Sequence, residues 1–220
     1  MKIKLILCSL ILLLSISVSA SDCPGIYPDN TELTPVNTVE LCSSFFVSRY
    51  SKEHRAVILV SEKLTKGSDV GKEERVNAFH ADSRVVNSPT PSEYLNTHHD
   101  KGHMAPAGDS ASPDQMHDTF LMTNMTPQEP TLNRQSWRIL EENVRKQFKE
   151  VQADMWVVNI ATYHSNPDMI GSIPIPVGYW KIVYSPGKVD YYYANNKPQA
   201  VVMKMQRVDV QKLIQDAGKF

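Results

Sequence analysis

The sequence has few cysteines, no charge excess and, beyond its first twenty residues, no long apolar run. Its 220 residues include 3 cysteines, and 23 basic residues stand against 24 acidic ones. Without a second apolar run of about 20 residues, no downstream helix is expected to span a membrane, and the mature protein should be soluble. Near-zero net charge excludes a global positive field, so any binding of polyanions must depend on a local cluster of basic side chains.

The first twenty residues combine a short basic head with an apolar run. Lys2 and Lys4 precede the apolar residues 5–14, and the small residues Ser19 and Ala20 close the segment. This order is typical of a secretory signal peptide cut after Ala20, and the run is shorter than the roughly 20 residues that a membrane anchor needs. We therefore expect an exported protein, either periplasmic or secreted, with residues 1–20 removed.

Removal of that segment takes away Cys8 and leaves Cys23 and Cys42. An even pair in an exported protein predicts one disulfide, which would stabilise the fold by about 3 kcal/mol in the chain-entropy description. Two free thiols are the alternative. Neither cysteine lies in a context that indicates catalysis.

The remaining sequence predicts an irregular N-terminal arm over residues 21–40 and one domain over residues 41–220. That domain is long enough to bury a full core. Apolar and β-branched runs indicate strands, and a run of good helix formers indicates one long helix. Strands are expected at 45–50, 56–64, 119–122, 155–163, 173–184, 190–193 and 200–205, with helices from 133 to about 152 and from 208 to 220.

Two dense segments organise the chain. The first, from His99 to Asp109, concentrates an imidazole, a carboxylate and an ammonium around glycines. Gly102 and Pro106 make a continuous helix here improbable. A functional site is therefore favoured over simple packing.

In the second segment Asn133, Trp137, Glu141 and Arg145 recur every four residues. On a helix this spacing places the four side chains along one stripe. An amide oxygen and a carboxylate on one stripe suit a hard cation such as Mg²⁺, which keeps most of its waters. The alternative is a surface helix in which Asn133 is an N-cap and Trp137 faces the core.

Together the two segments resemble the DNA/RNA non-specific endonucleases, the ββα-metal group that includes sugar-non-specific bacterial nucleases and endonuclease G. That family carries Asp-Arg-Gly-His, Met-Ala-Pro, Asn-Met-x-Pro-Gln, and then Asn, Trp and Leu-Glu. The corresponding residues here are Asp100-Lys101-Gly102-His103-Met104-Ala105-Pro106, Asn124-Met125-Thr126-Pro127-Gln128, Asn133, Trp137 and Leu140-Glu141. One departure stands out, because Lys101 replaces the arginine of the signature.

The resemblance implies an α+β fold, with a central, mostly antiparallel sheet flanked by helices. It also implies that His103 is the general base, a role that suits an imidazole titrating near neutrality. Asn133 would bind a hydrated Mg²⁺ directly and Glu141 would hold its water shell. Mn²⁺ or another divalent cation could substitute for Mg²⁺.

Basic side chains would offset the charge of the phosphate: Arg75, Lys101 and Arg145 at the reacting group, and Arg138 along the substrate. Lysine keeps the charge of the family arginine but loses its two-pronged geometry, so Lys101 could lower activity or shift its optimum. Asp100 is expected to orient His103 or a backbone amide, and Gln128 to fix the loop geometry.

Contacts to phosphate and metal encode little base recognition. The resemblance therefore implies cleavage of DNA and RNA, single- and double-stranded, with weak sequence preference and 5′-phosphate ends. Dimers occur in the family, so a homodimer is a further expectation.

Two other functions stay open. A homologue that binds nucleic acid but has lost turnover is conceivable because of Lys101. A zinc hydrolase would use His99 and His103, which are spaced like histidines one helical turn apart. Elsewhere, His80 and His98 are expected on the surface, and Asn124 begins a glycosylation sequon. The tyrosines at 191–193 suit cross-strand packing better than base stacking.

Overall fold

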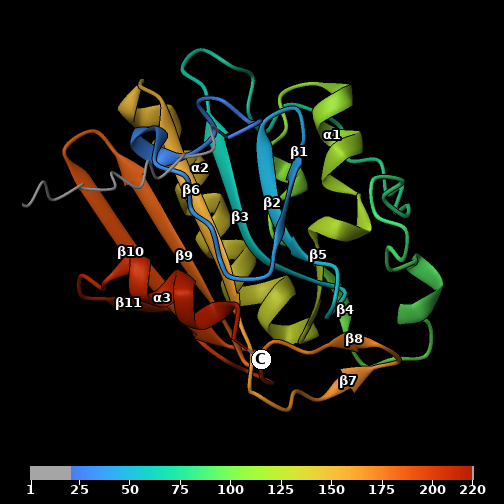
Figure 1. Cartoon of the computed structure of the whole chain (residues 1–220). Coiled ribbons are helices and arrows are strands. Elements are labelled where there is room, and N and C mark those ends of the chain that lie inside the picture. The colour runs from blue at the N-terminus through green and yellow to red at the C-terminus, as the bar shows by residue number, and fades with distance from the viewer. Residues whose placement is uncertain (1–20, 220) are drawn as a thin grey trace, which may run out of the picture.

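Seven antiparallel strands form the main sheet, in the order β1-β2-β3-β6-β9-β10-β11 (Figure 1). The computed structural model describes residues 21–219, so the predicted signal segment lies outside the described residues. The strands are β1 Val39–Cys42, β2 Phe46–Ser51, β3 Ala56–Leu64, β6 Met155–Thr162, β9 Gly178–Ser185, β10 Lys188–Asn195 and β11 Met203–Met205. The α+β class predicted from the sequence is confirmed.

The centre of the sheet follows from its apolar runs. Residues 57–60 of β3 are fully buried, as expected for a strand covered on both faces. β2 pairs with β3 through the predicted hairpin, with a bulge between Arg49 and Tyr50, and β6 pairs with the other edge of β3. The predicted strand at 173–184 is divided into the short β8 (Ile173–Pro174), which pairs with β7 (Met169–Ile170), and β9.

Each face of the sheet has its own cover. Leu140, Val144 and Phe148 of α2 (Arg138–Val151) pack on one face. The other face is covered by α3 (Val210–Ala217), through Ile214 and Ala217, and by the N-terminal arm. The arm contains η1 (Pro28–Asn30). Because β1 begins at Val39, residues 39–40 of the predicted arm already belong to the sheet.

The site is carried by a smaller unit beside the sheet. β4 (Asp100–His103) pairs antiparallel with β5 (Met125–Gln128), and the chain then enters η5 (Leu132–Trp137) and α2. This strand-strand-helix order is the predicted ββα arrangement. The first turns of the helix are π-helical rather than α-helical, so the stripe predicted from an even four-residue period begins on a widened turn.

The expected strand at 119–122 is wrong. Residues Pro113–Thr119 form α1, and Met122–Asn124 form the short helix η4, which leads into β5. Only Leu121 keeps an extended contact, a single bridge to His80. Ser112 caps α1 by accepting a hydrogen bond from the backbone of Gln115, a local signal that overrides the apolar run. The remaining elements are η2 (Pro91–Tyr94) and η3 (Ala107–Asp109).

The helix ends agree with the predictions. α2 ends at Val151 because Gln152 adopts the left-handed conformation that commonly terminates helices. The C-terminal helix begins after Asp209, whose side chain accepts from the backbone of Lys212. Within residues 21–219 the structure contains no helix with the length and apolar character needed to cross a membrane.

Candidate active site

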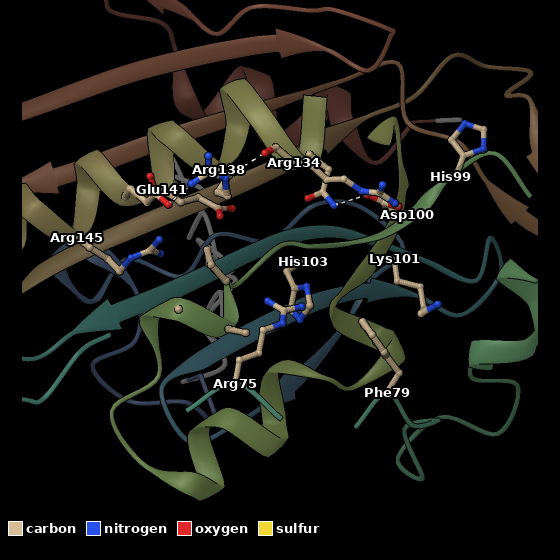
Figure 2. A pocket seen from close by; sticks show the side chains of 15 residues that line it. Arg75, Phe79, His99, Asp100, Lys101, His103, Arg134, Arg138, Glu141 and Arg145 are labelled. Carbon is tan, nitrogen blue, oxygen red and sulfur yellow. Dashed lines mark hydrogen bonds and ion pairs between the residues drawn. The ribbon is translucent and has the colours of Figure 1, made fainter. Parts of the chain in front are cut away.

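A cleft of about 530 Å³ lies between β4 and the η5–α2 helix. Nine residues singled out from the sequence line it together: Arg75, His99, Asp100, Lys101, His103, Asn133, Arg138, Glu141 and Arg145. Figure 2 shows Arg138, Glu141 and Arg145 projecting from α2, with His103 and Arg75 facing them from the opposite wall. The imidazole and the amide of Asn133 therefore share one cavity, as the sequence interpretation requires.

The strand that carries His103 is fixed by tight packing and by hydrogen bonds from the side chain of Asn124. A side chain at Gly102 would overlap the side chain of Gln128, so the close approach of β4 to β5 requires glycine. Gln128 itself is buried and does not line the cleft. Behind the strand, the side chain of Asn124 accepts from the backbone N–H of Ala105 at 2.9 Å and donates to its carbonyl at 2.9 Å.

The imidazole of His103 sits in an aromatic corner. Its ring centre is 5.0 Å from that of Phe120, in an edge-to-face arrangement, and 5.7 Å from that of Phe79. Burial, reinforced by the positive charge of Arg75, lowers the pKa of His103 to about 3. Its Nε2 is buried and has no hydrogen-bond partner among residues 21–219. At neutral pH the ring is therefore uncharged, the form that a general base needs, but the expectation that it titrates near neutrality is wrong.

Asp100 has a different partner from the one predicted. Its carboxylate accepts from Nδ2 of Asn133 at 2.8 Å and from Nε of Arg134 at 2.8 Å, and no hydrogen bond joins it to His103 within residues 21–219. Although burial alone would raise the pKa of Asp100, these two donors hold it below the usual range. Asp100 was expected to orient His103 or a backbone amide; its side chain instead turns across the cleft to the helix.

Asn133 is held with its amide oxygen available as a ligand. Its N–H₂ is occupied by Asp100, and its backbone N–H donates to the carbonyl of Glu129 at 2.9 Å. Since that backbone group is bonded inside a helical segment, the alternative in which Asn133 is only an N-cap is excluded. Trp137 faces the core, 3% exposed, as that same alternative expected.

Glu141 is the carboxylate of the cleft that makes no hydrogen bond or ion pair among residues 21–219, which leaves its charge without a direct partner. Burial, opposed by the charge of Lys181, raises the pKa of Glu141 to about 7. A carboxylate kept so poorly solvated, two helical turns from a fixed amide oxygen, is a donor set that fits a hydrated Mg²⁺ or Mn²⁺. The residues present thus fit a divalent cation.

Arg145 forms an ion pair with a buried carboxylate. Its guanidinium lies 2.6 Å from the carboxylate of Asp109, which is 2% exposed. A Cβ at Gly108 would lie 2.9 Å from that guanidinium, so a larger residue there would push the arginine aside. Burial raises the pKa of Asp109, and the charge of Arg145 opposes the shift. Arg145 lines the cleft as predicted, but much of its charge is neutralised.

The other basic residues of the cleft fall into two groups. Arg134 is paired with Asp100, and Arg138 with Glu142, one helical turn along α2. Lys101 lies above the ring of Phe79, and Arg75 above the ring of Phe120. Neither Phe79 nor Phe120 was predicted as a site residue, because an aromatic residue outside a periodic pattern carries no signal that separates packing from a site.

The zinc alternative loses its geometric basis. Residues 100–103 form a strand, so His99 and His103 are not one helical turn apart. Among residues 21–219, the one group of three potential ligands is Cys23, Glu40 and Cys42, and its two thiols are joined in a disulfide.

Three lesser expectations are also decided. His98 is exposed as predicted, but His80 is half-buried and stacks on His117 with ring centres 4.2 Å apart. The sequon residue Asn124 is completely buried, so a glycan there is incompatible with the fold. Tyr193 packs across the strands against Trp180, with ring centres 5.0 Å apart, as packing predicted.

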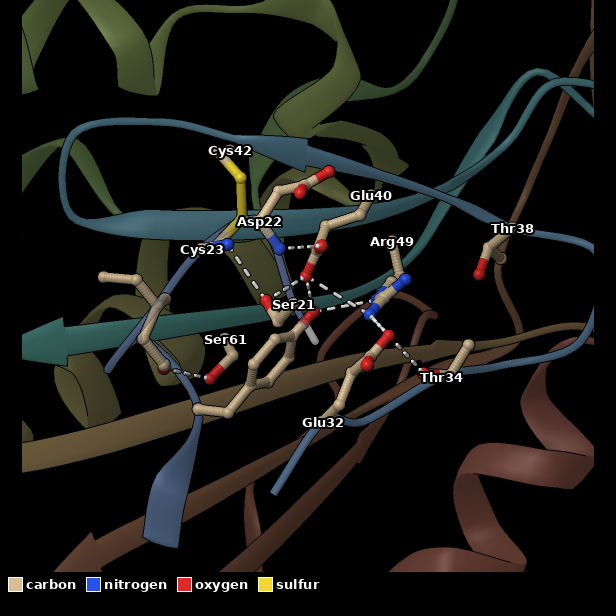
Figure 3. Close-up of polar contacts among 12 residues, drawn as sticks. Ser21, Asp22, Cys23, Glu32, Thr34, Thr38, Glu40, Cys42, Arg49 and Ser61 are labelled. Carbon is tan, nitrogen blue, oxygen red and sulfur yellow. Dashed lines mark hydrogen bonds and ion pairs between the residues drawn. A yellow bond between two sulfur atoms is a disulfide. The ribbon is translucent and has the colours of Figure 1, made fainter. Parts of the chain in front are cut away.

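The predicted disulfide between Cys23 and Cys42 is confirmed, with Cα atoms 5.6 Å apart. It joins the arm to β1 beside a buried ionic cluster (Figure 3). At the centre of the cluster Arg49 pairs with Glu32 and Glu40. Tyr27 accepts from Arg49 at 2.8 Å and donates to Glu40 at 2.8 Å. The arm is thus tied to the sheet on the face opposite α2.

Comparison with known proteins agrees with this geometry. The pattern of the DNA/RNA non-specific endonuclease family matches residues 29–218, most of the chain. This chain belongs to the DNA/RNA non-specific endonuclease family. The resemblance inferred from the sequence motifs is therefore confirmed.

Individual family relatives match over shorter stretches. A nuclease of a Nostoc species is 31% identical over 164 residues, which cover 71% of this chain and 59% of that protein. The nuclease of Serratia marcescens is 29% identical over 133 residues, covering 54% and 49%. This chain thus spans about half the length of these relatives.

The fold of the family is also found in a solved structure. A crystal structure of an EndoG/EndoGI complex superimposes with a TM-score of 0.63 at 23% identity, covering 72% of this chain and 74% of that one. At this identity the likeness concerns the fold, and it supports the ββα-metal nuclease architecture.

Proposed function

We propose that this chain is an exported, metal-dependent endonuclease that hydrolyses phosphodiester bonds of DNA and RNA with little sequence preference. One observation carries the proposal. An uncharged imidazole, His103, shares a single cleft with the fixed amide oxygen of Asn133 and the unpaired carboxylate of Glu141. Membership in the family supports the same activity. Export depends on residues 1–20, outside the described part of the chain.

Asn133 would hold a divalent cation directly, and Glu141 would accept hydrogen bonds from its waters. When bound, Mg²⁺ would supply charge relief at the phosphate and at the leaving oxygen. His103 would take the proton of the attacking water, an effect worth about 10²- to 10⁴-fold in rate. Because His103 is uncharged before substrate binds, no proton has to leave it first.

Lys101 and Arg75 would contact the phosphate oxygens on the wall opposite α2. Both cations are free of carboxylate partners within residues 21–219, so their charge remains available for a polyanion. Contacts of this kind address phosphate rather than base edges, which supports weak sequence preference and acceptance of both sugars. Cleavage on the 3′-oxygen side would leave 5′-phosphate ends.

The test uses the purified mature protein, plasmid DNA and a structured RNA, with Mg²⁺ and with excess chelator. We expect cutting of both substrates by the wild type, and loss of cutting with chelator, with His103→Ala and with Asn133→Ala. His98→Ala is the matched control, since His98 is exposed and outside the cleft. Persistent cutting by His103→Ala would overturn the assignment of the base. A wild type that binds DNA but never cuts it would favour the binding-only homologue.

A further inference from the structure

Ion pairing divides the basic residues of the cleft. Three of the five arginine and lysine side chains that line it are paired with carboxylates: Arg134 with Asp100, Arg138 with Glu142, and Arg145 with Asp109. The remaining two, Arg75 and Lys101, make no ion pair within the described residues. Arg75 donates only to the neutral side chain of Asn77, at 2.8 Å. No direct ion pair among the described residues therefore holds these two cations in place.

Aromatic rings, rather than carboxylates, contact these two cations. The ammonium nitrogen of Lys101 lies 4.8 Å from the ring centre of Phe79 and 5.6 Å from that of Tyr94. The guanidinium carbon of Arg75 lies 5.2 Å from the ring centre of Phe120. All three distances are within the range of cation–π attraction. A ring face restrains a cation without neutralising it, whereas a carboxylate does both.

Phe79 links the whole arrangement. Its ring meets Phe120 edge to face at 4.9 Å, lies 5.7 Å from the ring of His103, and stands under the ammonium of Lys101. It also packs against two separate apolar clusters, one containing Tyr94 and one containing Phe120. The lysine and the imidazole, two residues apart on β4, therefore rest on the same side chain.

We propose that Phe79 is a positioning residue of the reaction, which holds the Lys101 ammonium beside the His103 imidazole while leaving its charge available for phosphate. This inference rests on the proposed nuclease function. A lysine lacks the planar fork by which arginine fixes itself on two phosphate oxygens. The ring of Phe79 supplies the restraint that the lysine side chain does not.

A double-mutant cycle measures the coupling. Phe79→Leu removes the ring, Lys101→Gln removes the charge, and kcat and KM on a short DNA duplex are determined for both single variants and the double variant. Because the cation–π contact is lost only where the lysine is present, Phe79→Leu should cost about fivefold more in kcat/KM when Lys101 is present than when it is glutamine. Phe79→Tyr, which keeps the ring, should restore most of the activity. Equal losses in both backgrounds would overturn the proposal.

Phe45→Leu is the matched control for lost packing. Phe45 is 5% exposed, packs edge to face on Phe46 at 5.2 Å and does not line the cleft. It should lower thermal stability without changing the cycle at Lys101. Circular dichroism of every variant checks that each one is folded.

A second readout does not depend on activity. Protons on the side-chain carbon next to the Lys101 nitrogen should be shifted upfield in NMR spectra by the two rings, with Lys101→Arg used for assignment. Phe79→Leu should move this signal most of the way back toward that of an exposed lysine. An unshifted signal in the wild type would refute the placement. If the wild type neither binds nor cuts nucleic acid, the nuclease proposal fails while this spectrum still decides the position of Lys101.

Discussion

The side-chain N–H₂ of Asn133 donates to the carboxylate of Asp100 at 2.8 Å, across the gap between the helix and β4. This contact fixes which end of the amide faces the cleft. A metal ligand held by such an outer partner loses less freedom on binding, and removing the partner typically costs 10- to 100-fold in metal affinity. The bond also ties the strand carrying His103 to the helix carrying the ligand.

Asp100→Ala should therefore raise the Mg²⁺ concentration needed for half-maximal cleavage by about 10- to 100-fold, with activity recovered at high Mg²⁺. Arg134→Gln removes the other partner of Asp100 but leaves the bond to Asn133, so its metal requirement should stay close to that of the wild type. Cleavage rates measured against Mg²⁺ concentration decide this. An unchanged requirement in Asp100→Ala would show that Asn133 needs no such support.

The affinity for Mg²⁺ should depend steeply on pH around neutrality. Burial raises the pKa of Glu141 to about 7 in the metal-free protein, so below that pH a proton must leave before the carboxylate can serve the cation. The apparent Kd is expected to rise up to about tenfold per pH unit below 7 and to level off above it. Calorimetric titrations from pH 5.5 to 8.5 measure this, with Glu141→Gln as the variant that should bind weakly but without pH dependence.

At saturating Mg²⁺ the fall in cleavage activity below pH 7 that weak metal binding causes should largely disappear. The pKa of His103 is lowered to about 3, so this imidazole stays uncharged throughout the range in which Glu141 titrates. A fall in kcat/KM near pH 6.5 that persists at every metal concentration would contradict this separation of the two groups.

Glu141 should also weaken the metal-free fold above its ordinary pKa. The folded pKa is about 7 against an ordinary value of 4.5, so the unfolded chain loses this proton first as pH rises. Stability is then lost between pH 4.5 and 7, by up to about 3 kcal/mol. In chelator, Glu141→Gln should therefore unfold at a higher urea concentration than the wild type at pH 8, and at nearly the same concentration at pH 4. Equal midpoints at pH 8 would show that the carboxylate is well solvated.

How much the sequence could predict depended on the kind of signal. The core strands were predictable because a run such as 57–60 is apolar on both faces, and the C-terminal end of α2 because the chain around Gln152 breaks its pattern. The cleft residues were recognised through spaced motifs. Their actual partners were not, because the bond from Asn133 to Asp100 joins residues 33 positions apart and no local pattern encodes it. The strand expected at 119–122 failed for a related reason, since those apolar residues serve helix ends and tertiary packing.

The position of Arg145 in the cleft was predictable from the sequence, but its ion pair with Asp109 was not. Its pair with Asp109 is almost entirely buried, with side chains 16% and 2% exposed. Breaking a buried pair from one side typically costs about 3–5 kcal/mol, because the remaining charge is left unpaired. Arg145→Met should thus lower the free energy of unfolding by about 3 kcal/mol, and adding Asp109→Leu should recover most of it.

The matched control for Arg145 is Lys146→Met on the same helix. Lys146 is 77% exposed and lies 4.0 Å from Glu150, so its loss should change stability by less than about 1 kcal/mol. Urea denaturation of the four proteins provides the comparison. A stable but inactive Arg145→Met would instead place the main role of Arg145 in phosphate binding.

The disulfide should support stability without touching the chemistry, because the cluster around it covers the sheet face opposite α2. Cys23 and Cys42 close a loop with a sequence separation of 19, so changing both to serine should lower the free energy of unfolding by about 3 kcal/mol. Arg49, 4% exposed and paired with Glu32 and Glu40, should still hold the arm, so cleavage rates at 25 °C should stay near those of the wild type. Combining the serines with Arg49→Met should release the arm, detected as rapid amide exchange at Tyr27. Loss of activity in the serine variant alone would mean that the arm affects the cleft indirectly, through the sheet between them.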